Sequence, residues 1–148
     1  LREDLFLRGD LVLQCGINLP GLPKRLPGDE ARLEEAGRGI LEALGWAVRE
    51  VRSGVDEAGA YRTLLLRGDP RALKRAAVDW EERTPWGRLL DLDVVTPGGA
   101  LSRSDLGLPP RRCLVCLREA KACARLRGHR PEALRRRALL LWRGLLPG

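Results

Sequence analysis

The segment at residues 89–95 reads Leu-Leu-Asp-Leu-Asp-Val-Val, so apolar side chains alternate with two acidic ones, Asp91 and Asp93. A period of two is typical of a β-strand, in which successive side chains point to opposite faces of the sheet. Leu90, Leu92 and Val94 share one face, which must pack in a core, and the aspartates share the other. The chain is therefore predicted to contain a sheet with one covered face and one acidic, outward-looking face.

The acidic face is a candidate metal site. Two carboxylates on one face of a strand repel each other, and a divalent cation relieves that repulsion. Mg²⁺ takes oxygen ligands, usually one or two carboxylates together with water and substrate phosphates. Asp91 and Asp93 are therefore predicted to be catalytic Mg²⁺ ligands of a phosphoryl- or nucleotidyl-group transferase. The alternative is an exposed strand end with two solvated aspartates.

Apolar spacing and turn residues predict the remaining elements. Strands are expected over 11–19, 48–51, 60–66 and 100–102, and helices over 29–44, 70–82 and 134–145, with turns at Ser53-Gly54 and at 96–99. Asp29 and Asp69 are expected to be N-caps of the first two helices. This order predicts an α+β fold, with helices on one side of a sheet and a helical C-terminal extension. We interpret residues 1–148 as one domain, with 103–148 as a basic extension.

The charge distribution predicts an anionic partner. The formal net charge is +7, and arginines greatly outnumber acids between Arg103 and Arg143. Phosphates, nucleic acid or an acidic protein all suit such a surface. A GC-rich genome gives the same excess of arginine over lysine without a physical reason.

The C-terminal cysteines resemble a metal-ligand set. Cys113, Cys116, Cys123 and His129 supply the ligand types of a Cys₃His zinc site, and four cysteines are too few to be the main framework of a disulfide-stapled fold. On an unbroken helix Cys116 and Cys123 are about 10 Å apart, so one ion can bind both only if the helix starts late or bends. A structural zinc site is predicted on that condition, and buried thiols with an exposed histidine are the alternative. Cys15 is expected in the core.

These features belong to a longer pattern. The runs PWGRLLDLDV at 85–94, LSRSDLGLPPRRCLVC at 101–116 and CAR at 123–125, together with His129, resemble the apo-citrate lyase phosphoribosyl-dephospho-CoA transferase family, the citrate lyase holo-[acyl-carrier-protein] synthases. The likeness is close over 69–129 and looser over 11–46. Members attach the triphosphoribosyl-dephospho-CoA prosthetic group to a serine of the acyl carrier subunit of citrate lyase and release diphosphate. The resemblance implies that reaction here.

The resemblance also implies a nucleotidyltransferase-like mixed sheet in which Asp91 and Asp93 bind Mg²⁺. A third carboxylate is not evident, and Glu81, Glu82 and Asp105 are candidates. The predicted substrate-binding residues, which lie in or beside the motif, are Gly87, Arg88, Arg103, Arg111 and Arg112. Solvated surface charge is the alternative for each arginine. The family usually has histidine where this chain has Thr84, so any role of that histidine does not carry over.

The implied partners are the prosthetic-group precursor and the citrate lyase acyl carrier subunit, an acidic protein that the basic C-terminal half is expected to dock. One alternative is a related nucleotidyltransferase for the malonate decarboxylase carrier. Another is a non-enzymatic, basic, zinc-containing nucleic-acid-binding module, which is disfavoured because the tryptophans mostly fall on apolar faces and no nucleic-acid motif occurs.

The ends and hydropathy of the chain suggest its location. No stretch approaches the about 20 apolar residues that span a bilayer, and the N-terminus has no signal pattern, so a cytoplasmic protein without membrane contact is expected. The chain begins at Leu1 without methionine, and residues 1–7 read as the middle of a helix. Some N-terminal sequence is therefore expected to be missing.

Overall fold

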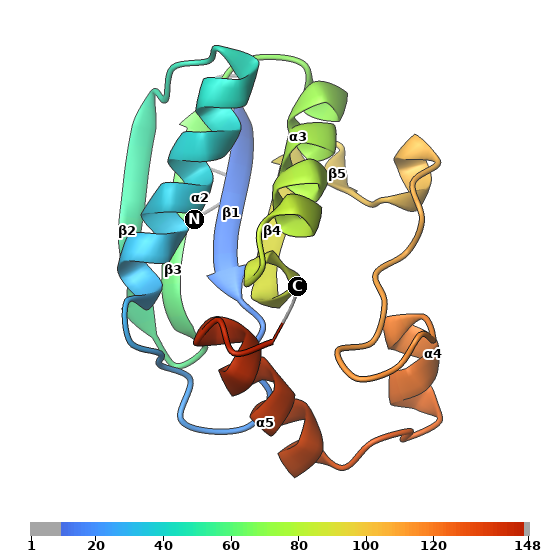
Figure 1. The fold of residues 1–148 in the computed structure, drawn as a ribbon. Helices are drawn as coiled ribbons and strands as arrows, with labels where there is room; N and C mark the ends of the chain where they lie inside the picture. The colour runs from blue at the N-terminus through green and yellow to red at the C-terminus, as the bar shows by residue number, and fades with distance from the viewer. Residues whose placement is uncertain (1–9, 147–148) are drawn as a thin grey trace.

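The computed structural model describes residues 10–146 of the chain (Figure 1). The strands are β1 (Leu11–Ile17), β2 (Glu50–Asp56), β3 (Gly59–Leu66), β4 (Leu90–Thr96) and β5 (Gly99–Leu101). The helices are α2 (Asp29–Leu44), α3 (Pro70–Arg83), α4 (Ala120–Arg125) and α5 (Pro131–Trp142), with 3₁₀ helices η1 (Gly87–Leu89) and η2 (Ser104–Leu106). Helices α2 and α3 lie side by side on one face of the sheet, which confirms the α+β class. The helix predicted over 1–7 lies outside the described residues.

The strands form one sheet in the order β2-β3-β1-β4-β5, and its pairings are antiparallel rather than mixed as predicted. The connection through α2 joins β1 to β2, and the connection through α3 joins β3 to β4. Each helix joins strands that run in the same direction, but another strand lies between them: β3 in the first case and β1 in the second. Parallel neighbours therefore do not arise within the described part of the sheet.

The hairpin between β2 and β3 turns after Asp56, so the turn predicted at Ser53-Gly54 was wrong. The Asp56 carboxylate accepts a hydrogen bond from a backbone N–H two residues on, at 2.8 Å, and Gly59 has a φ of 111°, which favours glycine. Gly54 lies inside β2, where a Cβ atom would be 2.8 Å from the Tyr61 hydroxyl. This glycine marks the close approach of a neighbouring side chain rather than a turn.

The two long helices begin differently. In α3 the Asp69 carboxylate accepts the N–H of Arg71 at 3.2 Å, which confirms the predicted cap. In α2 the N-cap is Gly28 and not Asp29, which is the first helical residue. The Asp29 carboxylate accepts a hydrogen bond from the N–H of Leu26 at 3.0 Å. This hydrogen bond connects the preceding loop to the first turn of the helix.

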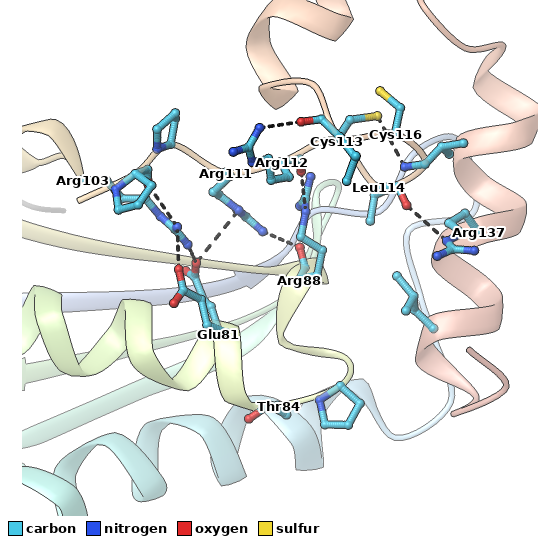
Figure 2. A pocket seen from close by; sticks show the side chains of 17 residues that line it. Glu81, Thr84, Arg88, Arg103, Arg111, Arg112, Cys113, Leu114, Cys116 and Arg137 are labelled. Carbon is cyan, nitrogen blue, oxygen red and sulfur yellow. Dashed lines mark hydrogen bonds and ion pairs between the residues drawn. The ribbon is translucent and has the colours of Figure 1, made fainter. Parts of the chain in front are cut away.

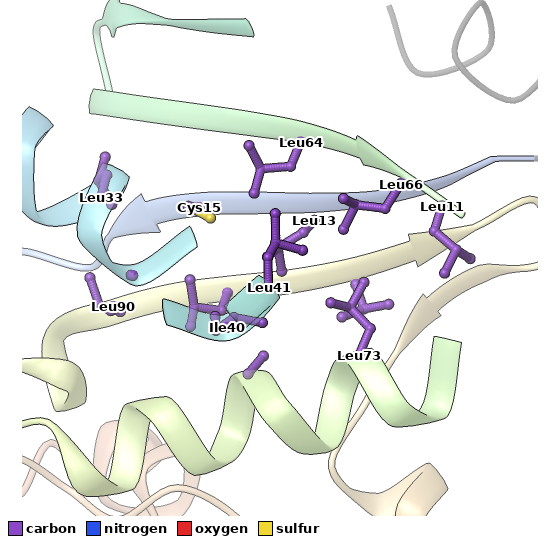
Figure 3. Packing of buried hydrophobic residues seen from close by; sticks show 14 of the residues in the cluster. Leu11, Leu13, Cys15, Leu33, Ile40, Leu41, Leu64, Leu66, Leu73 and Leu90 are labelled. Carbon is purple, nitrogen blue, oxygen red and sulfur yellow. The ribbon is translucent and has the colours of Figure 1, made fainter. Parts of the chain in front are cut away.

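A leucine-rich core fills the space between the sheet and helices α2 and α3 (Figure 3). Its largest fully buried members include Leu13 of β1, Leu33 and Ile40 of α2, and Leu73 of α3. Cys15 is buried among them, as predicted. This packing holds β1 and β4 in fixed positions beneath the helices.

Truncation of a core leucine is expected to destabilise the fold strongly. Leu13→Ala removes a fully buried side chain from the central strand, and we expect a loss of about 2–5 kcal/mol in the free energy of unfolding, measured by urea denaturation. Val55→Ala, at a side chain that is 45% exposed on β2, is the control and should change it by less than about 0.5 kcal/mol. Equal effects of the two substitutions would contradict the burial of Leu13 in the core.

The C-terminal extension leaves the sheet after β5, and its last helix is α5 (Figure 1). Helix α5 packs against Leu19 and Leu26 of the loop after β1 and against Leu89 of η1. The Trp142 indole N–H donates to the Pro27 carbonyl at 2.9 Å, and the Arg32 guanidinium lies 4.2 Å from the centre of the Trp142 ring. The predicted helix is confirmed, but it ends at Trp142, so Leu145 lies beyond it and is exposed. Within residues 10–146 no helix is long and apolar enough to span a bilayer.

Candidate active site

The aspartates project from β4 on the face opposite α2 and α3, as the alternation predicted. Leu90, Leu92 and Val94 are buried in the core, whereas Asp91 is exposed and Asp93 is partly exposed. Because β4 pairs with the central strand β1, both carboxylates project from a strand that is hydrogen-bonded within the sheet. Such a strand suits two carboxylates that must keep a fixed separation.

A glycine lies beside Asp91 on the neighbouring strand. The residue opposite Asp91 on β1 is Gly16, and a Cβ atom built on Gly16 would meet no atom of the described residues within 4 Å, its chain neighbours apart. As far as residues 10–146 are concerned, the missing side chain leaves room beside the carboxylate for a hydrated cation and substrate oxygens.

Lys74 of α3 supports the strand segment that carries the aspartates. Its side chain is buried, and its Nζ donates a hydrogen bond to the backbone carbonyl of Leu92, the residue between Asp91 and Asp93, at 3.1 Å. This contact was not predicted from the sequence. Its signal was a lysine next to Leu73 on the buried face of a helix, a position that lysine occupies only when its charge has partners.

A cavity of about 600 Å³ lies where α3, η1 and the segment after η2 meet (Figure 2). The predicted phosphate-binding residues that line it are Arg88, Arg103, Arg111 and Arg112. Thr84, the position at which the family usually has histidine, also lines it. Gly87 has a different place: it is buried against the backbone of Glu81, where a side chain has no room.

Glu81 supplies a buried negative charge among these arginines (Figure 2). Its carboxylate accepts a hydrogen bond from Arg103 at 2.7 Å and lies 3.9 Å from the Arg111 Nε. Burial raises the pKa of Glu81, and the Arg111 and Arg103 charges oppose that rise. Glu81 therefore orders the arginines while offsetting only part of their charge.

Arg88 is held in the cavity by hydrogen bonds with the neighbouring arginines. Its Nε donates to the Arg112 carbonyl at 2.7 Å, and its own carbonyl accepts a hydrogen bond from the Arg111 guanidinium. Burial, reinforced by the charge of Arg111, lowers the pKa of Arg88 to about 10. Because a guanidinium stays protonated, the unfavourable surroundings are relieved when an anion enters the cavity.

The carboxylates considered as a third magnesium ligand have other partners. Glu81 lies beneath the arginines, Glu82 pairs with Arg103 at 3.2 Å, and Asp105 accepts the N–H of Ser102 at 2.8 Å.

The structure gathers the arginines in one place and the aspartates in another. Arg88 lies in η1, which leads directly into β4, and Asp91 is the second residue of that strand. The two groups therefore adjoin the same end of β4. The aspartates look out from the sheet face and do not line the described cavity.

The cysteines and histidine of the extension converge. The ligand atoms of Cys113, Cys116, Cys123 and His129 all lie within 4.8 Å of one another, so the cluster can hold a metal ion. Helix α4 begins only at Ala120, after Cys116, which meets the condition that the seven-residue spacing imposed. All four cysteines of the chain are thiols, and the His129 Nε2 is buried without a hydrogen-bond partner among the described residues.

The fold and site define an α+β protein with an acidic strand face and a neighbouring cavity lined by arginines. The model of the apo-citrate lyase phosphoribosyl-dephospho-CoA transferase family matches residues 6–141, and the chain belongs to this family. It is 42% identical over 93 residues to proteins of that name from Escherichia coli O7:K1 (strain IAI39 / ExPEC) and Escherichia coli O1:K1 / APEC. The aligned part is 62% of this chain and about half, 51%, of each relative.

Proposed function

We propose that the chain transfers the phosphoribosyl-dephospho-CoA prosthetic group from its triphosphate precursor to a serine of the citrate lyase acyl carrier subunit. The observation that carries this proposal is the family match over residues 6–141, which includes both the aspartate strand and the arginine-lined cavity. Diphosphate and the triphosphate precursor are the polyanions that such a cavity suits.

In the proposed reaction the serine oxygen bonds to the phosphorus next to the ribose, and the bond from that phosphorus to the diphosphate oxygen breaks. The hydroxyl proton is released to solvent, and diphosphate leaves with the bonding electron pair. Negative charge builds on the leaving oxygens, and positioned guanidinium groups stabilise that charge. Arg88, Arg103 and Arg111 are the residues proposed for this role.

Asp91 and Asp93 fit the Mg²⁺ ion that the family implies, because both side chains share one accessible face and, among residues 10–146, nothing fills the space over Gly16 beside Asp91. When bound, the ion supplies charge neutralisation for the phosphate oxygens. Two carboxylates suffice, because Mg²⁺ usually keeps waters and substrate oxygens as its other ligands. Lys74 is proposed to keep the peptide between the two aspartates in position.

The same proposal places one zinc ion in the Cys/His cluster as a structural ion. Three thiols and one imidazole whose ligand atoms lie within 4.8 Å match the ligand number of tetrahedral zinc. We also propose that the acidic carrier subunit docks on the arginine-rich extension and that the protein works in the cytoplasm.

The direct test is incubation of the chain with the precursor, Mg²⁺ and the apo carrier subunit, followed by mass spectrometry of the carrier. We expect one phosphoribosyl-dephospho-CoA group per carrier, no product when Mg²⁺ is omitted, and no transfer to a carrier whose acceptor serine is alanine. The malonate decarboxylase carrier is the matched comparison. Preferential labelling of that carrier would replace the proposed partner, and an unmodified mass for both would refute the proposed reaction.

A further inference from the structure

The segment that carries Arg111 and Arg112 buries little apolar surface, and its Leu114, which is only partly buried, packs against the hydrophobic cluster around α5. Within α4 only Cys123 is buried, and the side chains of Leu117 and Leu126 are 87% and 68% exposed. A short segment that buries so little apolar surface needs a disulfide or a metal to hold one conformation. Because the cysteines are thiols and form no disulfide, a metal at the Cys/His cluster is the interaction that can stabilise this segment.

Backbone contacts around the cysteines form a compact loop suited to metal ligation. The Cys113 N–H donates to the Arg118 carbonyl at 2.8 Å, and the Ala120 N–H donates to the Arg111 carbonyl at 2.8 Å. The Val115 N–H donates to the Cys113 Sγ at 3.4 Å. A hydrogen bond donated to a ligand atom orients that ligand and stabilises its negative charge once the metal is bound.

This loop is joined directly to the cavity. Arg111 and Arg112 immediately precede the ligand Cys113, and both contact Arg88: the Arg112 carbonyl accepts its Nε at 2.7 Å, and the Arg111 guanidinium donates to its carbonyl. These two contacts run in opposite directions between η1 and the loop. A displacement of the loop would therefore disturb both Arg88 and Arg111, which line the cavity.

We propose that the metal site positions the arginines of the cavity. Zinc held by Cys113, Cys116, Cys123 and His129 fixes residues 111–129, and loss of the ion releases Arg111 from the arrangement that receives the diphosphate part of the substrate. This positioning role rests on the proposed function in two respects, namely zinc in the cluster and diphosphate in the cavity. It adds that diphosphate binding in the cavity depends on zinc binding in the cluster.

The test measures the binding of inorganic diphosphate to the full chain by calorimetry and the zinc content by elemental mass spectrometry. Three samples are compared: zinc-loaded protein, protein stripped by a chelator and returned to chelator-free buffer with Mg²⁺, and stripped protein reloaded with one equivalent of Zn²⁺. We expect one zinc per chain, diphosphate affinity about tenfold or more weaker after stripping, and recovery on reloading. Far-UV circular dichroism should show the sheet intact in all three.

A ligand variant gives a second measurement. Cys116→Ser is expected to lower zinc retention and diphosphate affinity together, whereas Leu126→Ala, at an exposed position of the same segment that does not line the cavity, should leave both unchanged. Unchanged diphosphate affinity in stripped, zinc-free protein overturns the positioning role and leaves the proposed function standing. Protein that retains no zinc would refute the proposed zinc site. Zinc-loaded protein that binds no diphosphate would refute the proposed diphosphate site. Either result also overturns the positioning role.

Discussion

Asp91→Asn is expected to lower the rate of prosthetic-group transfer by about a thousandfold while the protein stays folded. The substitution keeps the size of an accessible side chain on β4 but removes the charge that the proposed Mg²⁺ requires. A loss of about 4 kcal/mol of transition-state stabilisation corresponds to that change in rate. Asp93→Asn should have an effect of the same order, because both carboxylates look out from the same face.

The rate is measured by following carrier mass at saturating precursor and a range of Mg²⁺ concentrations. Asp79→Asn is the matched control, since Asp79 is an exposed aspartate of α3 that pairs with Arg83; it should turn over like the wild type. Thermal unfolding of all three variants should resemble that of the wild type. If Asp91→Asn and Asp93→Asn both retained normal rates, the aspartates would be solvated surface groups and the proposed metal site would be wrong.

Arg111→Ala is expected to weaken diphosphate binding by about tenfold to a hundredfold, the effect of losing a charge-assisted hydrogen bond worth about 1.5–3 kcal/mol. Arg111 is suited to this test because its Nε is buried without a hydrogen-bond partner among the described residues. Glu81 keeps Arg103 as a partner at 2.7 Å in the variant, so the buried carboxylate is not left alone. The fold should therefore tolerate the change.

Calorimetric titration with inorganic diphosphate, at two ionic strengths, provides the measurement. Arg75→Ala, which removes an exposed arginine of α3, controls for the loss of one positive charge. We expect its affinity to stay close to that of the wild type. An affinity of Arg111→Ala that matches this control would place the phosphate site elsewhere in the molecule.

The local features of the fold were readable from residues that lie close together along the chain. The strand at β4 and the cap at Asp69 follow from side-chain period and from the hydrogen bonding of a single carboxylate, so their structure matches the prediction. The turn after Asp56 was missed because Ser53-Gly54 has an equally good local turn signal. Only the neighbouring strand, with Tyr61 over Gly54, distinguishes a close approach from a turn.

The candidate site also has features that were predicted from the sequence and features that only the structure shows. The residue types of the aspartate pair, the arginines and the Cys/His cluster were apparent in the sequence, and the four cluster residues do converge. The sequence left Glu81 as a candidate metal ligand, but the fold buries it beneath Arg103 and Arg111. Lys74 was missed because its partner, the Leu92 carbonyl, is a backbone group on another element.

By itself, the sequence determined the alternating acidic strand, the helices that cover one side of the sheet, the metal-type ligand set and the resemblance to the transferase family. These features depend on side chains within a few positions of one another. Only the tertiary structure decided that the sheet is antiparallel, that the arginines gather around Glu81, and that Gly16 lies opposite Asp91. Such relations depend on strand order and packing, which bring together residues that are distant along the chain.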